Sequence, residues 1–167
     1  MRESVVVFFA RYLVFFFVPL MAFTSWNKRS RPFRHSAYEA AWAGLLALTI
    51  AMLVSVVVGR DRPFRASPDV ILRIPLPISE HAFPSGHASV AFAIAAAIAY
   101  GNGWLGVVAC IIAFLVAFGR VATGVHYPTD IFGGILVGIF SFWLVRRMHR
   151  SLRRKDLRRI ARGHKNL

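Results

Sequence analysis

Residues 40–58 read AAWAGLLALTIAMLVSVVV, an apolar run whose polar members are only Thr49 and Ser55. A membrane-spanning helix needs roughly 20 apolar residues, at about 1.5 Å of rise each, to cross a hydrocarbon core about 30 Å thick. The run meets that requirement without help from its flanks. It therefore predicts a transmembrane helix.

Four more apolar runs lie on either side of this one. Residues 5–23 are apolar except for Arg11, and the shorter runs 87–100, 104–119 and 131–145 have small or mildly polar flanks that can extend them. The chain is 57% hydrophobic with a mean hydropathy of +0.56, which is too apolar for a soluble domain of this length. We expect an all-α integral membrane protein, a bundle of about five transmembrane helices.

The positive charge is concentrated in two places. Ten of the 21 Lys and Arg residues lie between Arg146 and Lys165, and four more lie within residues 28–34. Basic residues beside membrane helices mark the cytoplasmic side, so this placement indicates topology and not a nucleic-acid partner. We expect a transmembrane domain over 1–145 and a cytoplasmic tail over 146–167. The tail either lies near anionic lipid head groups or is only a solvated topology signal.

The same topology places three polar clusters on the outer side of the membrane, at the ends of helices. The first cluster is Gly59-Arg60-Asp61-Arg62-Pro63-Phe64. Arginine keeps its charge and binds phosphate with two parallel hydrogen bonds. Alone, however, this cluster is more typical of an interfacial anchor.

The second cluster, Phe83-Pro84-Ser85-Gly86-His87, precedes an apolar run. It suits a helix N-terminus, whose unpaired backbone N–H groups form an anion site. Ser85 adds a hydroxyl, Gly86 permits close approach of the backbone, and His87 can donate a proton. Taken alone, however, this cluster is more typical of a simple capped helix start.

The third cluster comprises Arg120 and the run His126-Tyr127-Pro128-Thr129-Asp130. Proline is tolerated in a first helical turn, so we expect a helix to begin near Pro128. A carboxylate four residues after a histidine can hold its ring and stabilise imidazolium character. Alternatively, Asp130 only complements the helix dipole.

Together the three clusters resemble the signature of the type 2 phosphatidic acid phosphatase superfamily. That signature reads Lys-six residues-Arg-Pro, then Pro-Ser-Gly-His, then Ser-Arg-five residues-His-three residues-Asp. The second part is complete in residues 84–87, and the other two parts match except at one position each. Ser55 stands at the lysine position, and Gly119 stands at the serine position. The residue sequences of the first and third clusters look most like those of bacterial undecaprenyl-diphosphate phosphatases.

The resemblance implies a metal-independent phosphatase without a cofactor, located in the plasma membrane with its active site on the periplasmic or extracellular side. His126 would be the nucleophile that forms phosphohistidine, Asp130 would hold its ring, and His87 would be the acid. Residues implied to bind phosphate are Arg62, Ser85, Gly86 and Arg120. We expect Arg60 to supply the cation that Ser55 lacks.

Several alternatives remain open from the sequence. Phosphatidate or phosphatidylglycerophosphate could be the substrate in place of undecaprenyl diphosphate. The chain could instead bind lipid phosphate without catalysis, or a metal could bind His81, His87, His126 and Asp130. The Gly134 and Gly138 pair permits close helix contact, either within the chain or in a homodimer.

Overall fold

The computed structural model describes residues 2–26, 31–67, 69–74 and 81–163, and its regular structure there is entirely helical, without a strand. Lys28, Arg29, part of the outer loop 60–85 and the end of the basic tail lie outside the described residues. In chain order the elements are α1 (Arg2–Arg11), the 3-10 helix η1 (Leu13–Phe16), α2 (Phe17–Trp26), α3 (Arg31–Val58), α4 (Pro63–Ala66), α5 (Gly86–Gly101), α6 (Gly103–Ala122) and α7 (Pro128–Gly163).

The first predicted span is divided in the structure. Residues 5–23 fall into α1, η1 and α2, with Tyr12 between the first two. Pro19 lies in the first turn of α2, and its ring would clash with the carbonyl group four residues earlier in a continuous α-helix. The tighter 3-10 turn before it avoids that clash.

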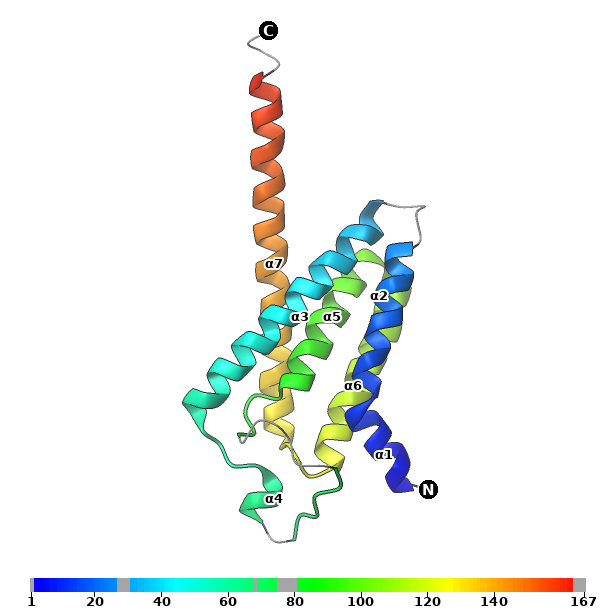
Figure 1. Ribbon diagram of the computed structural model, residues 1–167, viewed down its shortest axis with the longest axis vertical. Helices are drawn as coiled ribbons and strands as arrows, with labels where there is room; N and C mark the ends of the chain where they lie inside the picture. The colour runs from blue at the N-terminus through cyan, green and yellow to red at the C-terminus, as the bar shows by residue number, and fades with distance from the viewer. Residues whose placement is uncertain (1, 27–30, 68, 75–80, 164–167) are drawn as a thin grey trace.

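The centre of the bundle is α5, which packs against α3, α6 and α7 (Figure 1). Small residues make this close packing possible. Along α3 the buried face is a stripe of alanines at helical spacing, Ala40, Ala43, Ala47 and Ala51, which ends at the buried Ser55. Such stripes let helix backbones approach closely in a membrane.

Gly134 and Gly138 pack within the chain, against α5. A Cβ atom on Gly134 would lie 2.8 Å from the Ser85 carbonyl oxygen, and one on Gly138 would lie 2.5 Å from that of Ser89. Real Cβ atoms do not approach backbone oxygens so closely, so only glycine fits at these two positions. The pair therefore fixes the distance between α5 and α7.

An ionic cluster joins α3 to α7 at the end of the bundle away from α4. The buried Glu39 accepts hydrogen bonds from Arg146 at 2.8 Å and interacts with His149 Nδ1 at 2.9 Å. Arg146 also lies over the ring of Tyr100, with its Cζ 3.2 Å from the ring centroid. The predicted boundary at residue 146 lies inside α7, which continues without interruption to Gly163.

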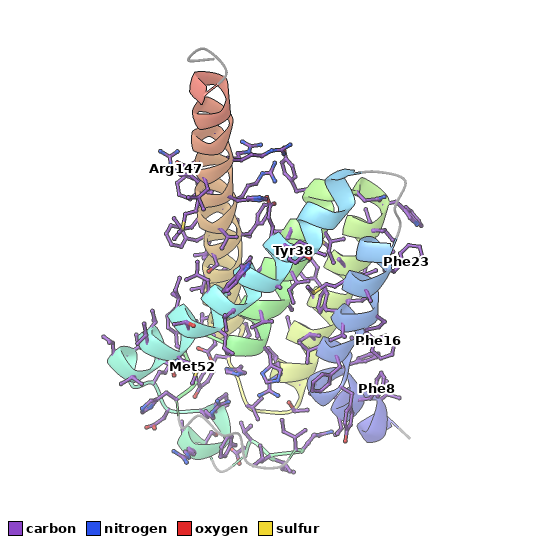
Figure 2. All side chains as sticks on the ribbon, turned by 45° about the horizontal axis from the view of Figure 1, so that its top comes forward. Phe8, Phe16, Phe23, Tyr38, Met52 and Arg147 are labelled. Carbon is purple, nitrogen blue, oxygen red and sulfur yellow. The ribbon has the colours of Figure 1, made fainter. Side chains whose placement is uncertain are left out.

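Among the described residues, three segments are long and apolar enough to cross a membrane, Ala37–Ala66, Gly103–Ala122 and Pro128–Arg154, and two apolar helices are shorter, Leu13–Phe23 and Gly86–Gly101. Large apolar side chains such as Phe16, Phe23 and Met52 project outward from the bundle (Figure 2). That surface suits lipid. The chain is an all-helical membrane protein, and the count of five spans stays a prediction.

Segments that the sequence places on one side of the membrane lie at one end of the bundle. Figure 1 shows the start of α1, α4 and the turn between α6 and α7 at this end, with the C-terminus at the other. Ser85 is the N-cap of α5, and α7 begins at Pro128. Both predicted helix starts are confirmed.

Candidate active site

His126 lies at the centre of this end, in the turn between α6 and α7, with only 4% of its surface exposed. Its Nδ1 is 2.8 Å from the carbonyl oxygen of Ala82. A carbonyl oxygen only accepts hydrogen bonds, so in the neutral ring Nδ1 carries the proton. The lone pair of the ring is therefore on Nε2, which faces NH1 of Arg62 at 3.5 Å.

Burial lowers the pKa of His126 below its ordinary value. The nearby Asp130 carboxylate opposes this shift, and the positive charges of Arg120 and Arg62 add to it. A lowered pKa keeps the imidazole neutral at physiological pH. The Nε2 lone pair is then available for reaction.

Asp130 is fully buried in the first turn of α7 and joins several parts of the site. Its Oδ2 accepts a hydrogen bond from the Tyr127 amide at 2.7 Å and lies 3.6 Å from His126 Nδ1. Its main-chain oxygen accepts from the amide of Ser85 at 3.0 Å. The carboxylate thus lies beside the imidazole, but the Ala82 carbonyl is the nearer partner of Nδ1.

Arg60 contacts the same carboxylate. Its NH1 donates to Asp130 Oδ1 at 2.8 Å and to Thr129 Oγ1 at 2.7 Å, and its guanidinium lies over the Tyr127 ring at 4.2 Å. The main-chain oxygen of Arg60 accepts from the amide of Ala82 at 2.7 Å. Arg60 therefore supports both groups that lie next to the His126 ring nitrogen.

Arg62 and Arg120 bring two buried guanidiniums to the site, with 3% and 5% of their surfaces exposed. Arg62 is the N-cap residue of α4, and its NH1 donates to the Val125 carbonyl at 2.9 Å. Arg120 lies in the last turn of α6. In the described part of the chain, Arg120 Nε is buried without a hydrogen-bond partner, as expected of a group that awaits an anion.

The start of α5 supplies the remaining groups. Ser85 is fully buried, and its Oγ accepts from the Ala88 amide at 3.5 Å, while Gly86 opens the helix. His87 is half-buried, close enough to Arg120, His126 and Arg62 for their charges to act on it. The three clusters of the sequence thus meet at one place.

No group of three or more His, Cys, Asp or Glu that could hold a metal occurs within the ranges the structure describes, so the alternative metal site that includes His81 is not formed there.

Sequence reasoning missed two carbonyl groups of this site. The Ala82 carbonyl holds His126, and the Ala10 carbonyl accepts from Arg120 NH1 at 3.3 Å. Every residue has a carbonyl group, so neither residue type carries a signal. Only the fold shows which carbonyl groups are used.

Fold and site define a helical membrane protein with histidine, carboxylate and guanidinium groups gathered at one end. The chain belongs to the PAP2 superfamily, whose family model matches residues 36–154. The family resemblance seen in the sequence is confirmed, and the protein is a membrane lipid phosphatase of the PAP2 type.

The chain is similar to several curated and solved relatives. It is 32% identical to undecaprenyl-diphosphatase BcrC of Bacillus subtilis, over 90% of this chain and 77% of the relative. It is 31% identical to the putative undecaprenyl-diphosphatase YbjG of Escherichia coli, over 83% of this chain and 69% of the relative. The crystal structure of Aquifex aeolicus LpxE matches with a TM-score of 0.66 and 26% identity, over 87% of this chain and 83% of that one.

The contacts of Arg60 lead to a prediction. Arg60→Ala is expected to lower kcat by about 10- to 100-fold with little change in KM, because the mutation frees the groups that orient His126. Arg60→Lys should recover part of the loss, and Asp61→Asn, at an exposed neighbour, should remain near wild type. Steady-state kinetics on a lipid phosphate would measure these effects.

The same kinetics separate this role from phosphate binding. A change in KM alone would instead indicate that Arg60 replaces the missing lysine as a phosphate ligand, the role expected from the sequence. Unchanged kinetics in Arg60→Ala would contradict both roles.

Proposed function

We propose that this protein hydrolyses a polyprenyl diphosphate, with undecaprenyl diphosphate as the expected substrate, to the monophosphate through a phosphohistidine at His126. The observation that carries the proposal is the imidazole geometry. Nδ1 is bound by the Ala82 carbonyl, and Nε2 lies beside the Arg62 guanidinium. That arrangement leaves one nucleophilic nitrogen next to a cation that attracts phosphate.

In the first step, the Nε2 lone pair of His126 attacks the terminal phosphorus. The bond from that phosphorus to the bridging oxygen breaks, and His87 protonates the oxygen as the lipid monophosphate leaves. Asp130 stabilises the positive charge that develops on the imidazole. A negative group beside the ring favours this charge without itself accepting a proton.

Negative charge on the transferred phosphoryl group is stabilised by fixed donors. These are the guanidiniums of Arg62 and Arg120, the Ser85 hydroxyl and the backbone N–H groups at Gly86, where the N-terminus of α5 adds its dipole. In the second step, His87 accepts a proton from water, the water oxygen attacks phosphorus, and the phosphorus–nitrogen bond breaks. Orthophosphate and the free imidazole result, without a metal or cofactor.

The relatives support the choice of substrate. Two of the similar curated proteins are named as undecaprenyl-diphosphatases. Phosphatidylglycerophosphatase B of Bacillus subtilis is also 31% identical, over 70% of this chain and 63% of the relative. Phosphatidylglycerophosphate or phosphatidate is therefore the second candidate, and lipid-phosphate binding without turnover is the third.

The charge distribution supports an orientation in the plasma membrane. The basic end of α7 faces the cytoplasm by the positive-inside rule. The end that carries His126 then faces the periplasm or the cell exterior. The head group of a lipid in the outer leaflet could reach it there.

The proposal is tested by phosphate release from purified protein in excess chelator. Undecaprenyl diphosphate, phosphatidate and phosphatidylglycerophosphate are each presented in mixed detergent micelles at equal surface concentration. We expect the highest kcat/KM with undecaprenyl diphosphate and no effect of the chelator.

Each other outcome contradicts a defined part of the proposal. A higher kcat/KM with phosphatidate or phosphatidylglycerophosphate would favour the second candidate. Loss of activity in chelator, restored by a divalent metal, would contradict metal independence. Folded protein that releases no phosphate from any of the three lipids would favour binding without turnover.

A further inference from the structure

Helix α1 lies outside the part of the chain that matches the family model, residues 36–154, yet it contacts the end of α6 that carries Arg120. Figure 1 shows α1 beside α6 at the end of the bundle that holds the site. The contact involves the two consecutive residues Gly119 and Arg120. Each of them meets the backbone of α1.

Gly119 lies directly against that backbone. A Cβ atom at this position would lie 2.7 Å from the amide nitrogen of Ala10 and 2.9 Å from the carbonyl carbon of Phe9. These neighbours are main-chain atoms in a helix, so they cannot turn aside as a flexible side chain would. The superfamily signature has serine at this position, and here the α1 backbone fills the place of that side chain.

Arg120 meets the last turn of the same helix. Its NH1 donates to the Ala10 carbonyl at 3.3 Å. The last carbonyl groups of a helix have no partner within the helix and carry partial negative charge, so they favour a cation. Ala10 itself is buried, with 1% exposed.

The guanidinium of Arg120 is also close to the other charged groups of the candidate site. Arg120 Nε is buried without a hydrogen-bond partner among the described residues, and the charges of Arg120 and Arg62 act on one another and on His126. A guanidinium that is held on one side by α1 can present its other N–H groups to an anion.

We infer that the last turn of α1 is part of the active site and positions Arg120 for phosphate, and that glycine at position 119 is what permits α1 to dock there. Ala10 and Gly119 are positioning residues, since neither contacts the phosphoryl group. The inference rests on the proposed function of Arg120 as a phosphate ligand. It also means that the signature serine is incompatible with this site.

The test introduces the serine of the signature at position 119. Gly119→Ser and Gly119→Ala are expected to lower kcat/KM for the lipid by about 10- to 100-fold, because a shift of about 1 Å in a positioning group has effects of this size. Gly103→Ala is the matched control on the same helix, where an added Cβ has nothing within 4 Å. It should remain near wild type, and the thermal unfolding of all variants in detergent reports whether each is folded.

A double-mutant cycle separates positioning from a general loss of stability. In an Arg120→Ala background, Gly119→Ala should cost little more, because the group that it displaces is already absent. An equal loss of activity in both backgrounds would overturn the inference. Full activity of Gly119→Ser would overturn it as well.

A binding measurement keeps the inference separate from the proposed function. Orthovanadate mimics the pentacoordinate phosphoryl group, and its Kd for wild type and Gly119→Ala can be measured without turnover. If wild type releases no phosphate from any lipid, the proposed function is wrong, whereas weaker vanadate binding by Gly119→Ala would still support the inference. Equal vanadate binding by the two proteins would overturn it.

Discussion

Replacing His126 with alanine is expected to lower kcat for phosphate release by at least about 10³-fold, the largest effect of any single substitution in the chain. The change removes the proposed nucleophile, Nε2, of a ring that lies between the Ala82 carbonyl oxygen and the Arg62 guanidinium. Lipid binding should change much less than turnover. Initial rates and KM would be measured with undecaprenyl diphosphate.

His149→Ala is the matched control for this variant. His149 contacts Glu39 at the end of the bundle away from the candidate site, so its loss should leave turnover near wild type. Rapid quenching of a reaction with lipid labelled in its terminal phosphate should also trap a labelled protein in wild type and not in His126→Ala. Residual activity of His126→Ala near that of wild type would show that another group attacks phosphorus.

Arg62→Ala is expected to lower kcat by about 10²- to 10³-fold, the range seen when one preorganised donor to a developing charge is removed. Arg62 is buried, its NH1 lies 3.5 Å from Nε2 of His126, and the Val125 carbonyl fixes its position. Arg62→Lys should recover part of the rate, because lysine keeps the charge but loses the fork geometry.

Arg65→Ala provides the comparison within the same short helix. Arg65 is exposed in α4, so its loss should change the rate little. If Arg65→Ala and Arg62→Ala lost activity equally, the effect would reflect the general positive potential at this end of the protein. A rate for Arg62→Ala close to that of wild type would contradict a direct role.

Much of the bundle could be predicted because each signal was local. Apolar runs and capping residues indicated α3, α5, α6 and α7, and Ser85 and Pro128 lie at helix starts as expected. The break in the N-terminal segment was missed because residues 5–23 are apolar apart from Arg11 and are long enough for one span. The signal was Pro19, whose ring excludes a regular helix through Phe15.

The titratable members of the candidate site were also proposed from the sequence, since ionisable residues at the ends of membrane helices are costly unless they serve a polar site. Their partners were not. The contact of Arg60 with Asp130 depends on how the link from α3 to α4 folds over the start of α7. The close approach of α1 to Gly119 depends on the tertiary structure, because an absent side chain does not indicate what occupies its place.

Helix α7 is held at two points, by the contacts of Asp130 in the candidate active site in its first turn and by the contact of Arg146 with Glu39 of α3 near its middle. The sixteen residue steps from Asp130 to Arg146 span about 24 Å of helix axis, somewhat less than the roughly 30 Å hydrocarbon core of a typical bilayer. A thinner bilayer is accommodated by tilting of α7, and a thicker one by local thinning of the bilayer or by snorkelling of flanking residues. Because tilting of α7 would carry Asp130 with it, we expect the rate to depend on the acyl-chain length of the host lipids.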